Sequence, residues 1–128
     1  MKKIALTLTL VTVLAAPAAA SAGGLWPHVY STKITGATPA VMNGTWRLSL
    51  QKAAFRVTKG GAAAVSGSLT IAGNRVTFRD LAGPFACRGS QATGTYTWRL
   101  QGRRLTLTPV SDRCTGRRTI LTRPFTLV

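Results

Sequence analysis

The chain has 128 residues, with 17 lysines and arginines against two acidic residues, and its formal net charge is +15. Such a charge attracts polyanions and keeps like molecules apart, so we expect a monomer, but it says nothing about fold. A merely solvated basic surface is the alternative to a polyanion-binding role. With one histidine and two aspartates, the composition argues against acid–base catalysis, and the length predicts a single folded domain.

Residues 1–22 have the pattern of a secretory signal peptide. Two lysines precede an apolar run over residues 4–16, and alternating alanines follow Pro17. The run is shorter than the roughly 20 residues that span a bilayer, so we expect no transmembrane anchor. Cleavage is expected after Ala22, with Ala20 as the alternative. The mature protein is then secreted or periplasmic.

The segment over residues 23–43 shows no sustained alternation of apolar and polar residues and contains two prolines. We expect an irregular N-terminal leader that holds at most one short strand, over residues 28–34. Trp26 and Tyr30 are expected to dock at one end of the core, because two aromatic residues argue against disorder.

Regular alternation begins at Gly44 and predicts half-buried strands joined by tight turns. The strands are expected over residues 44–50, 54–58, 64–71, 75–79, 95–101, 104–108 and 119–128. In the last of these, Pro124 requires an edge or a bulge. No segment after the signal peptide shows helical periodicity over eight residues.

The turns between these strands predict the strand register. The clearest hairpin spans residues 95–108, where a two-residue turn at Gly102-Arg103 puts all large apolar side chains on one face. Around residues 60–61 we expect a three-residue loop with a glycine bulge. At Gly73-Asn74 we expect a turn in which both residues have positive φ. The predicted apolar pairs are Leu100 with Leu105, Trp98 with Leu107, Leu50 with Phe55, Leu48 with Val57, Val57 with Val65, Leu69 with Phe78, and Ile71 with Val76.

Seven strands in sequential order, or eight with the leader, predict an all-β fold. A small antiparallel up-and-down barrel of seven to eight strands leaves no exposed edge, and a two-sheet β-sandwich is the alternative. The side chains expected to point inward are Trp46, Leu48, Leu50, Phe55, Val57, Val65, Leu69, Ile71, Val76, Phe78, Tyr96, Trp98, Leu100, Leu105, Leu107, Phe125 and Leu127.

The only two cysteines, Cys87 and Cys114, lie just outside the two ends of the hairpin over residues 95–108. In an oxidising compartment they are expected to form one disulfide that closes the base of this hairpin. By the chain-entropy argument, closing this loop stabilises the fold by roughly 3–4 kcal/mol.

Residues 44–46, Gly-Thr-Trp, resemble the Gly-x-Trp signature of lipocalins and the wider calycin group, and the C-terminal half is similar to small lipocalin-like domains of secreted bacterial proteins. The resemblance implies a barrel domain over residues 44–128. It also implies that Trp46 packs against an arginine at the closed end of the barrel. The chain is shorter than lipocalins and lacks their C-terminal helix and Thr-Asp-Tyr motif. The arginine candidates are Arg117, Arg118 and Arg123.

Catalytic and metal chemistry are not expected. A carboxylate pair needs both aspartates at one site, but Asp80 follows an arginine-rich strand and Asp112 is expected in an Asx-turn or an ion pair with Arg113. His28 lies in the leader, and the sequence has neither a nucleophile elbow nor closely spaced metal ligands. We therefore expect no enzyme activity, no metal and no cofactor.

The remaining function class is a secreted binding domain. One hypothesis is a small apolar or amphiphilic ligand in a shallow barrel pocket walled by Phe55, Tyr96 and Trp98. Another is an inhibitor of a secreted hydrolase that uses the loops around Cys87 and Cys114.

A third hypothesis is a cationic surface for envelope polyanions or acidic proteins. Its arginines alternate outward along the strands, and no aromatic residue lies among them, so specific nucleic-acid recognition is not expected. They are Arg47, Arg56, Arg75, Arg79, Arg99 and Arg104.

Overall fold

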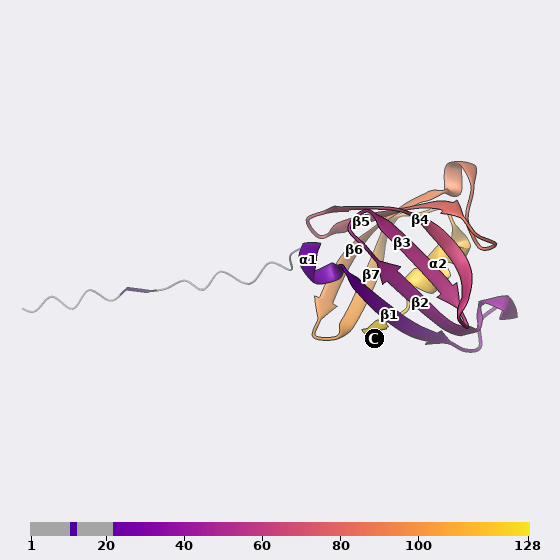
Figure 1. Ribbon diagram of the computed structural model, residues 1–128, viewed down its shortest axis with the longest axis horizontal. Helices are drawn as coiled ribbons and strands as arrows, with labels where there is room; N and C mark the ends of the chain where they lie inside the picture. The colour runs from indigo at the N-terminus through magenta and orange to yellow at the C-terminus, as the bar shows by residue number, and fades with distance from the viewer. Residues whose placement is uncertain (1–10, 13–21) are drawn as a thin grey trace, which may run out of the picture.

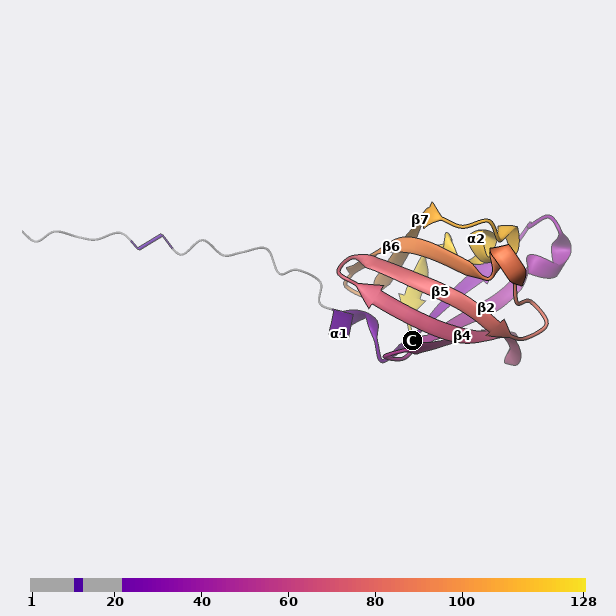
Figure 2. The same cartoon turned by 90° about the horizontal axis from the view of Figure 1, so that it is seen from above.

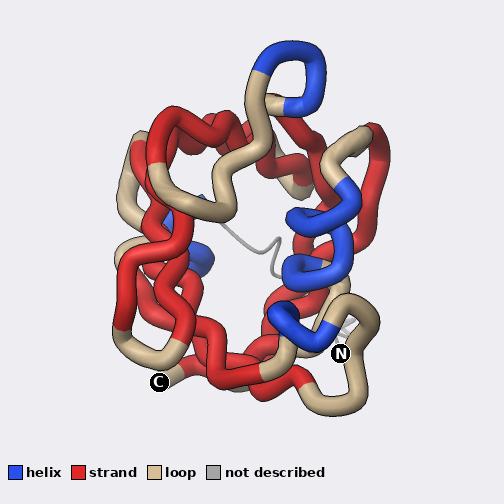
Figure 3. Tube along the Cα trace, turned by 90° about the vertical axis from the view of Figure 1, so that its right-hand side faces the viewer, coloured by secondary structure: helices blue, strands red, loops and turns tan. Residues whose placement is uncertain are grey.

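The computed structural model of the protein describes residues 11–12 and 22–128. Eight strands form one closed antiparallel barrel, in which each strand pairs with its neighbours in sequence and β8 returns to β1 (Figures 1 and 3). The predicted up-and-down barrel is confirmed, and the alternative sandwich is wrong. Nearly all of the predicted signal peptide lies outside the described residues.

The strands follow each other around the barrel in chain order, and Figure 2 shows β4, β5, β6 and β7 side by side. They are β1 (His28–Ile34), β2 (Gly44–Leu50), β3 (Ala54–Lys59), β4 (Ala62–Ala72), β5 (Arg75–Ala82), β6 (Thr93–Gln101), β7 (Arg104–Ser111) and β8 (Phe125–Leu127). The helical elements are α1 (Ala22–Leu25), η1 (Ala40–Met42), η2 (Gly89–Gln91) and α2 (Thr115–Leu121). Three of these, η1, η2 and α2, lie at one end of the barrel, which we call the α2 end (Figures 1 and 3).

Strand β1 makes the segment over residues 23–43 part of the barrel. It pairs with β2 along its whole length, from His28 opposite Leu50 to Ile34 opposite Gly44, and with β8 through Tyr30 and Ser31. The short strand expected over residues 28–34 is therefore confirmed. Its pairing with β8 closes the barrel, so neither the first nor the last strand is left as an open edge.

In the hairpins, the side chains that were predicted to share one face of the sheet do share it. All seven predicted apolar pairs are opposite one another, including Leu100 with Leu105 across the turn at residues 102–103. The turn at residues 60–61 differs in detail, because it has two residues and a bulge within the strands brings Val57 opposite Val65. At the turn over residues 73–74, Gly73 alone has a positive φ, so the expectation for Asn74 is wrong.

The prediction of a continuous strand over residues 119–128 is wrong. Residues 115–121 form α2, and β8 is only three residues long. Arg117, Ile120 and Leu121 are all buried, and their i, i+3, i+4 spacing puts them on one face of a helix, whereas a strand would point two neighbouring residues to opposite sides. Arg123 lies in the turn after α2 and not on the apolar face of a strand.

The core is formed by the inward side chains of the barrel. The predicted inward residues are buried, except for Ile71, Leu100 and Leu127, which are partly buried against the core. Phe78 joins the barrel walls, because its ring packs edge-to-face on Phe55 at 5.1 Å and on Tyr96 at 5.9 Å. The core also contains buried residues that are not in the predicted inward set: Leu25, Tyr30, Ile34, Met42, Ala64, Ile120 and Leu121.

Gly67 is a position where the barrel wall has no room for a side chain. A Cβ atom there would lie 1.8 Å from the carbonyl oxygen of Arg79 and 2.8 Å from the Phe55 ring. We expect Gly67→Ala to lower the free energy of unfolding by about 1–3 kcal/mol or more, as overpacking does. Gly116→Ala is the control, because nothing lies within 4 Å of its added carbon and alanine favours the helix by about 0.5–1 kcal/mol. Denaturant unfolding of both variants measures this, and equal stabilities would contradict the register at Gly67.

Candidate functional site

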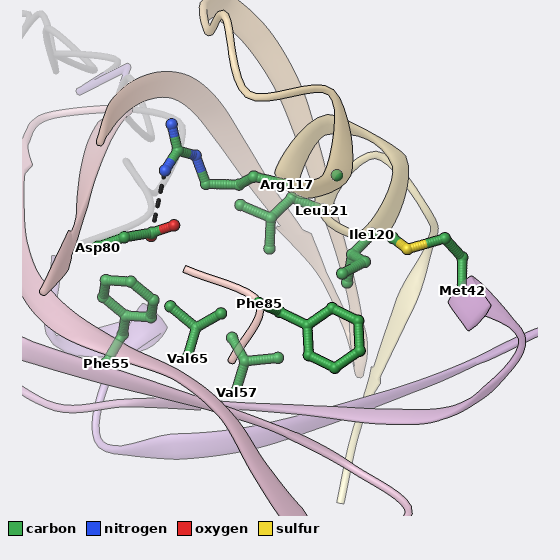
Figure 4. Close-up of a pocket in the computed structure, with 10 residues that line it drawn as sticks. Met42, Phe55, Val57, Val65, Asp80, Phe85, Arg117, Ile120 and Leu121 are labelled. Carbon is green, nitrogen blue, oxygen red and sulfur yellow. Dashed lines mark ion pairs between the residues drawn. The ribbon is translucent and has the colours of Figure 1, made fainter. Parts of the chain in front are cut away.

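A buried ionic cluster lies at the α2 end of the barrel. The guanidinium of Arg117, on α2, contacts Asp80 near the end of β5 (Figure 4). It also contacts Asp112 in the loop after β7. Arg117 Nη1 is 3.1 Å from Asp80 Oδ1, and Nη2 is 2.7 Å from Asp112 Oδ1. The two aspartates were expected at separate sites, so this expectation is wrong. The partner of Asp112 is Arg117 and not Arg113.

The Arg117 guanidinium donates four hydrogen bonds in addition to its ion pair with Asp80. Nε donates to Asp112 Oδ2 at 2.8 Å, and Nη1 and Nη2 donate to the carbonyl oxygens of Ala92 and Gln91 at 3.0 and 2.8 Å. Together with the two carboxylates, these contacts tie α2 to β5, to the η2 segment and to the loop after β7. A planar fork with five donors suits this role in a way that a lysine does not.

The disulfide reinforces the same cluster. Cys87 and Cys114 are bonded, as predicted. The backbone N–H of Cys87 donates to Asp80 Oδ2 at 2.8 Å, and that of Cys114 donates to Asp112 Oδ1 at 2.9 Å, which is the predicted Asx-turn. The Asp80 carboxylate lies within 4.8 Å of both sulfur atoms. Bonded sulfurs offer no thiolate, so in this oxidised form the group serves as a structural clasp.

Tyr96 completes the cluster from the barrel interior. Its hydroxyl donates to Asp112 Oδ2. Burial first and this hydrogen bond second raise the pKa of Tyr96 far above its usual value. Burial alone would raise the pKa of Asp112, but hydrogen bonds from Arg117, Tyr96 and Cys114 outweigh it and hold the pKa below its usual range. Asp112 is therefore a fixed negative charge at neutral pH.

A small cavity lies between this cluster and the barrel (Figure 4). Its volume is about 40 Å³. A single water needs roughly 10–15 Å³ by the same measure, and ligand pockets commonly span about 300–1,000 Å³. As it stands, this cavity is therefore too small for a typical ligand. Apart from Gly116, the cavity is lined by the Asp80–Arg117 pair and by apolar residues: Met42, Phe55, Val57, Val65, Phe85, Ile120 and Leu121.

The three residues predicted to wall a pocket do not meet at one cavity. Phe55 lines the cavity below α2. Tyr96 is fully buried and bonded to Asp112. Trp98 is buried beside the β4–β5 turn, where its Nε1 donates to the carbonyl oxygen of Gly73 at 3.0 Å. The cavity instead lies under α2. This helix was not predicted, because the alternation of residues 119–128 indicates a strand.

Trp46 is buried at the α2 end, and the cation over its ring is Lys59. Lys59 Nζ lies 5.8 Å from the centre of the indole, and Trp46 Nε1 donates to the carbonyl oxygen of Met42 at 2.8 Å. Arg117 is engaged by the carboxylates, and neither Arg118 nor Arg123 contacts this ring among the cation–π pairs of the described residues. The predicted β2–β3 register contained the signal, because one further pair puts Trp46 opposite Lys59.

The six predicted surface arginines are all exposed on the outside of the barrel. Arg47 pairs with Thr58 and Arg56 with Ser49, so the two arginines are diagonal neighbours on the outer face of β2 and β3. They border an open hollow of about 510 Å³, which we call the β2–β3 hollow. It is lined by the two guanidinium groups, a glycine turn, one valine and three hydroxyl side chains, which are Thr45, Ser49 and Thr58.

Comparisons with family models, with curated proteins and with solved structures found no match to this chain. Among the helices of residues 22–128, none is long and apolar enough to cross a bilayer.

The ionic cluster predicts a large cost for removing its cation. Arg117→Ala leaves two buried carboxylates without their partner, and we expect a loss of about 3–5 kcal/mol in the free energy of unfolding at neutral pH. Arg118→Ala, next to it on the exposed side of α2, is the control and is expected to change stability by about 0.5 kcal/mol or less.

The stability difference between the wild type and Arg117→Ala is expected to depend on pH. In the wild type, the lowered pKa of Asp112 contributes stability above its unfolded value of about 3.9, and this contribution is lost as the pH falls through the folded value. In Arg117→Ala, burial without the guanidinium is expected to raise the pKa of Asp112. Protonation at acidic pH then removes an unpaired buried charge, so the variant loses less stability there than at neutral pH. Urea unfolding between neutral and acidic pH should show the gap between the two proteins narrowing. A gap that is constant with pH would contradict this account.

Proposed function

We propose that this protein is a non-catalytic binding domain whose cationic outer surface binds polyanions. The observation that carries the proposal is the burial of both acidic side chains of the chain. The side chains of Asp80 and Asp112 are 2% and 0% exposed, and both are held by Arg117. Of the 17 lysines and arginines, Lys2 and Lys3 lie outside the described residues and Arg117 is buried, which leaves 14 on the surface with no acidic side chain between them.

The β2–β3 hollow is the place where we expect a polyanion to bind. Arg47 and Arg56 offer guanidinium groups to sulfate, phosphate or carboxylate oxygens, and the hydroxyl side chains beside them add neutral donors. No aromatic side chain lines it, so stacking on nucleic-acid bases has no support.

Charge-matched variants test this proposal. We expect the wild type to bind heparin, with an affinity that falls steeply as salt rises. Arg47→Gln with Arg56→Gln should weaken binding about tenfold at low salt, which corresponds to about 1.4 kcal/mol. Arg88→Gln with Arg113→Gln removes the same charge from exposed loop positions and should weaken binding about threefold or less. Fluorescence titration over a salt series measures both.

The results separate the parts of the proposal. Failure of the wild type to bind heparin at low salt would refute a polyanion-binding function. Equal weakening by the two double variants would mean that net charge alone binds, without a site at the β2–β3 hollow.

We also propose that the domain is lipocalin-like and works outside the cytoplasm. The closed eight-strand barrel supports the first statement, together with the Gly-Thr-Trp sequence over residues 44–46 at the start of β2. The Cys87–Cys114 disulfide supports the second, because such bonds persist in oxidising compartments. Self-repulsion by the surface cations favours a monomer.

A second candidate function is the binding of a small apolar or amphiphilic molecule inside the barrel. One observation favours it, which is the apolar lining of the cavity below α2. Of the residues predicted for such a pocket, only Phe55 lines this cavity. The site therefore lies at the α2 end of the barrel, between its wall and α2.

A further inference from the structure

We propose that the cavity below α2 binds a small neutral molecule with an apolar body and one hydroxyl group, of which phenol is the simplest aromatic example, and that this hydroxyl donates to Asp80 Oδ1. The inference rests on the second candidate function and names its ligand class. It is independent of polyanion binding at the β2–β3 hollow.

The walls of the cavity determine the body of the ligand. Seven apolar side chains surround the space, and the only charged groups are those of Asp80 and Arg117 at one side (Figure 4). A molecule with several polar groups would leave most of them without partners, at a cost for each. The ligand must therefore be apolar over all of its surface except the part that faces this pair.

Asp80 Oδ1 is the acceptor that the protein itself leaves open. Asp112 is saturated, because its two oxygens accept from Tyr96, Cys114 and Arg117. Asp80 Oδ2 accepts from the backbone of Cys87. Asp80 Oδ1 is buried and has no hydrogen bond, and its 3.1 Å ion pair with Arg117 Nη1 lacks the alignment of one. Buried acceptors without a donor are rare, so a ligand that brings a donor is favoured here.

Charge then selects a neutral donor. The cluster has two carboxylates and one guanidinium, so its excess negative charge disfavours an anion or a ligand that presents only acceptors. An ammonium group would have to cross a strongly cationic surface and lose its hydration in an apolar cavity. A hydroxyl group supplies the missing donor without either cost.

The side chain of Phe85 must move before the cavity can hold the aromatic ring of a ligand. The cavity of about 40 Å³ holds only a few waters as it stands. The opposite wall, α2, is fixed by the disulfide and by Arg117. Phe85 is partly buried on the loop after β5, and its ring packs edge-on against Trp46 at 5.4 Å. Rotation of this side chain enlarges the cavity without breaking a hydrogen bond of the cluster.

Phenol and benzene form the matched pair of probes, since they differ by the hydroxyl alone. In methyl-labelled wild-type protein, we expect phenol to shift the NMR signals of Val57, Val65, Ile120 and Leu121 in a saturable way. Benzene should bind at least tenfold more weakly. In Asp80→Asn, the amide oxygen can still accept from Cys87, and the NH2 group takes the place of Oδ1. Phenol can then only accept a hydrogen bond through its weakly basic oxygen, so its advantage over benzene should shrink to about threefold or less.

The experiment tests the role of Asp80 Oδ1 and the existence of an apolar binding site separately. Equal affinities for phenol and benzene in the wild type would overturn the role of Asp80 Oδ1 while leaving an apolar site in place. Absence of saturable shifts at these methyl groups with either probe would mean that the cavity holds water only, and would overturn the second candidate function as well. The wild-type comparison stands by itself if Asp80→Asn fails to fold. Ile120→Phe, which fills the cavity, is expected to abolish binding of both probes.

Discussion

The contact on which the rest of the structure depends is the buried guanidinium of Arg117 between Asp80 and Asp112. Strand β8 has three residues and pairs through only two of them with each neighbour, so the seam of the barrel is short. The segment that leads into this strand is held by Arg117, whose hydrogen bonds and ion pairs reach three separate parts of the chain. Barrel closure therefore relies on a polar network at one end as well as on strand pairing.

This network explains the unusual surface. A buried arginine needs carboxylate partners, and the chain has only two carboxylate side chains to supply. Both are used inside the barrel end, where backbone N–H groups of the two disulfide-bonded residues hold them in place. The exterior is then left with cations alone. The absence of acidic side chains from the surface is thus a consequence of how the interior is held together.

The parts of the fold that follow from local patterns could be predicted from the sequence. Strand parity and turn length place Leu100 opposite Leu105 and Leu69 opposite Phe78, because each register depends on residues close in the chain. The ionic cluster could not be predicted in this way, since Asp80 and Arg117 are 37 positions apart and meet only after the barrel closes. The same applies to α2, because seven residues with buried positions at i, i+3 and i+4 are too few to outweigh the alternation that follows them.

The position of the cavity could not be predicted for the same reason as α2. The residues that cover it lie on a helix, whereas the alternation of residues 119–128 predicts a strand. Had residues 119–128 formed a strand, their side chains would have filled the interior as those of the other strands do, where Phe55, Phe78 and Tyr96 pack edge-to-face across the wall. A helix instead covers the end of the barrel with Ile120 and Leu121 and meets the wall imperfectly, which leaves a space beneath it. The small apolar cavity and the buried ion pair beside it thus both depend on α2, which supplies Arg117, Ile120 and Leu121 at the point where the barrel closes.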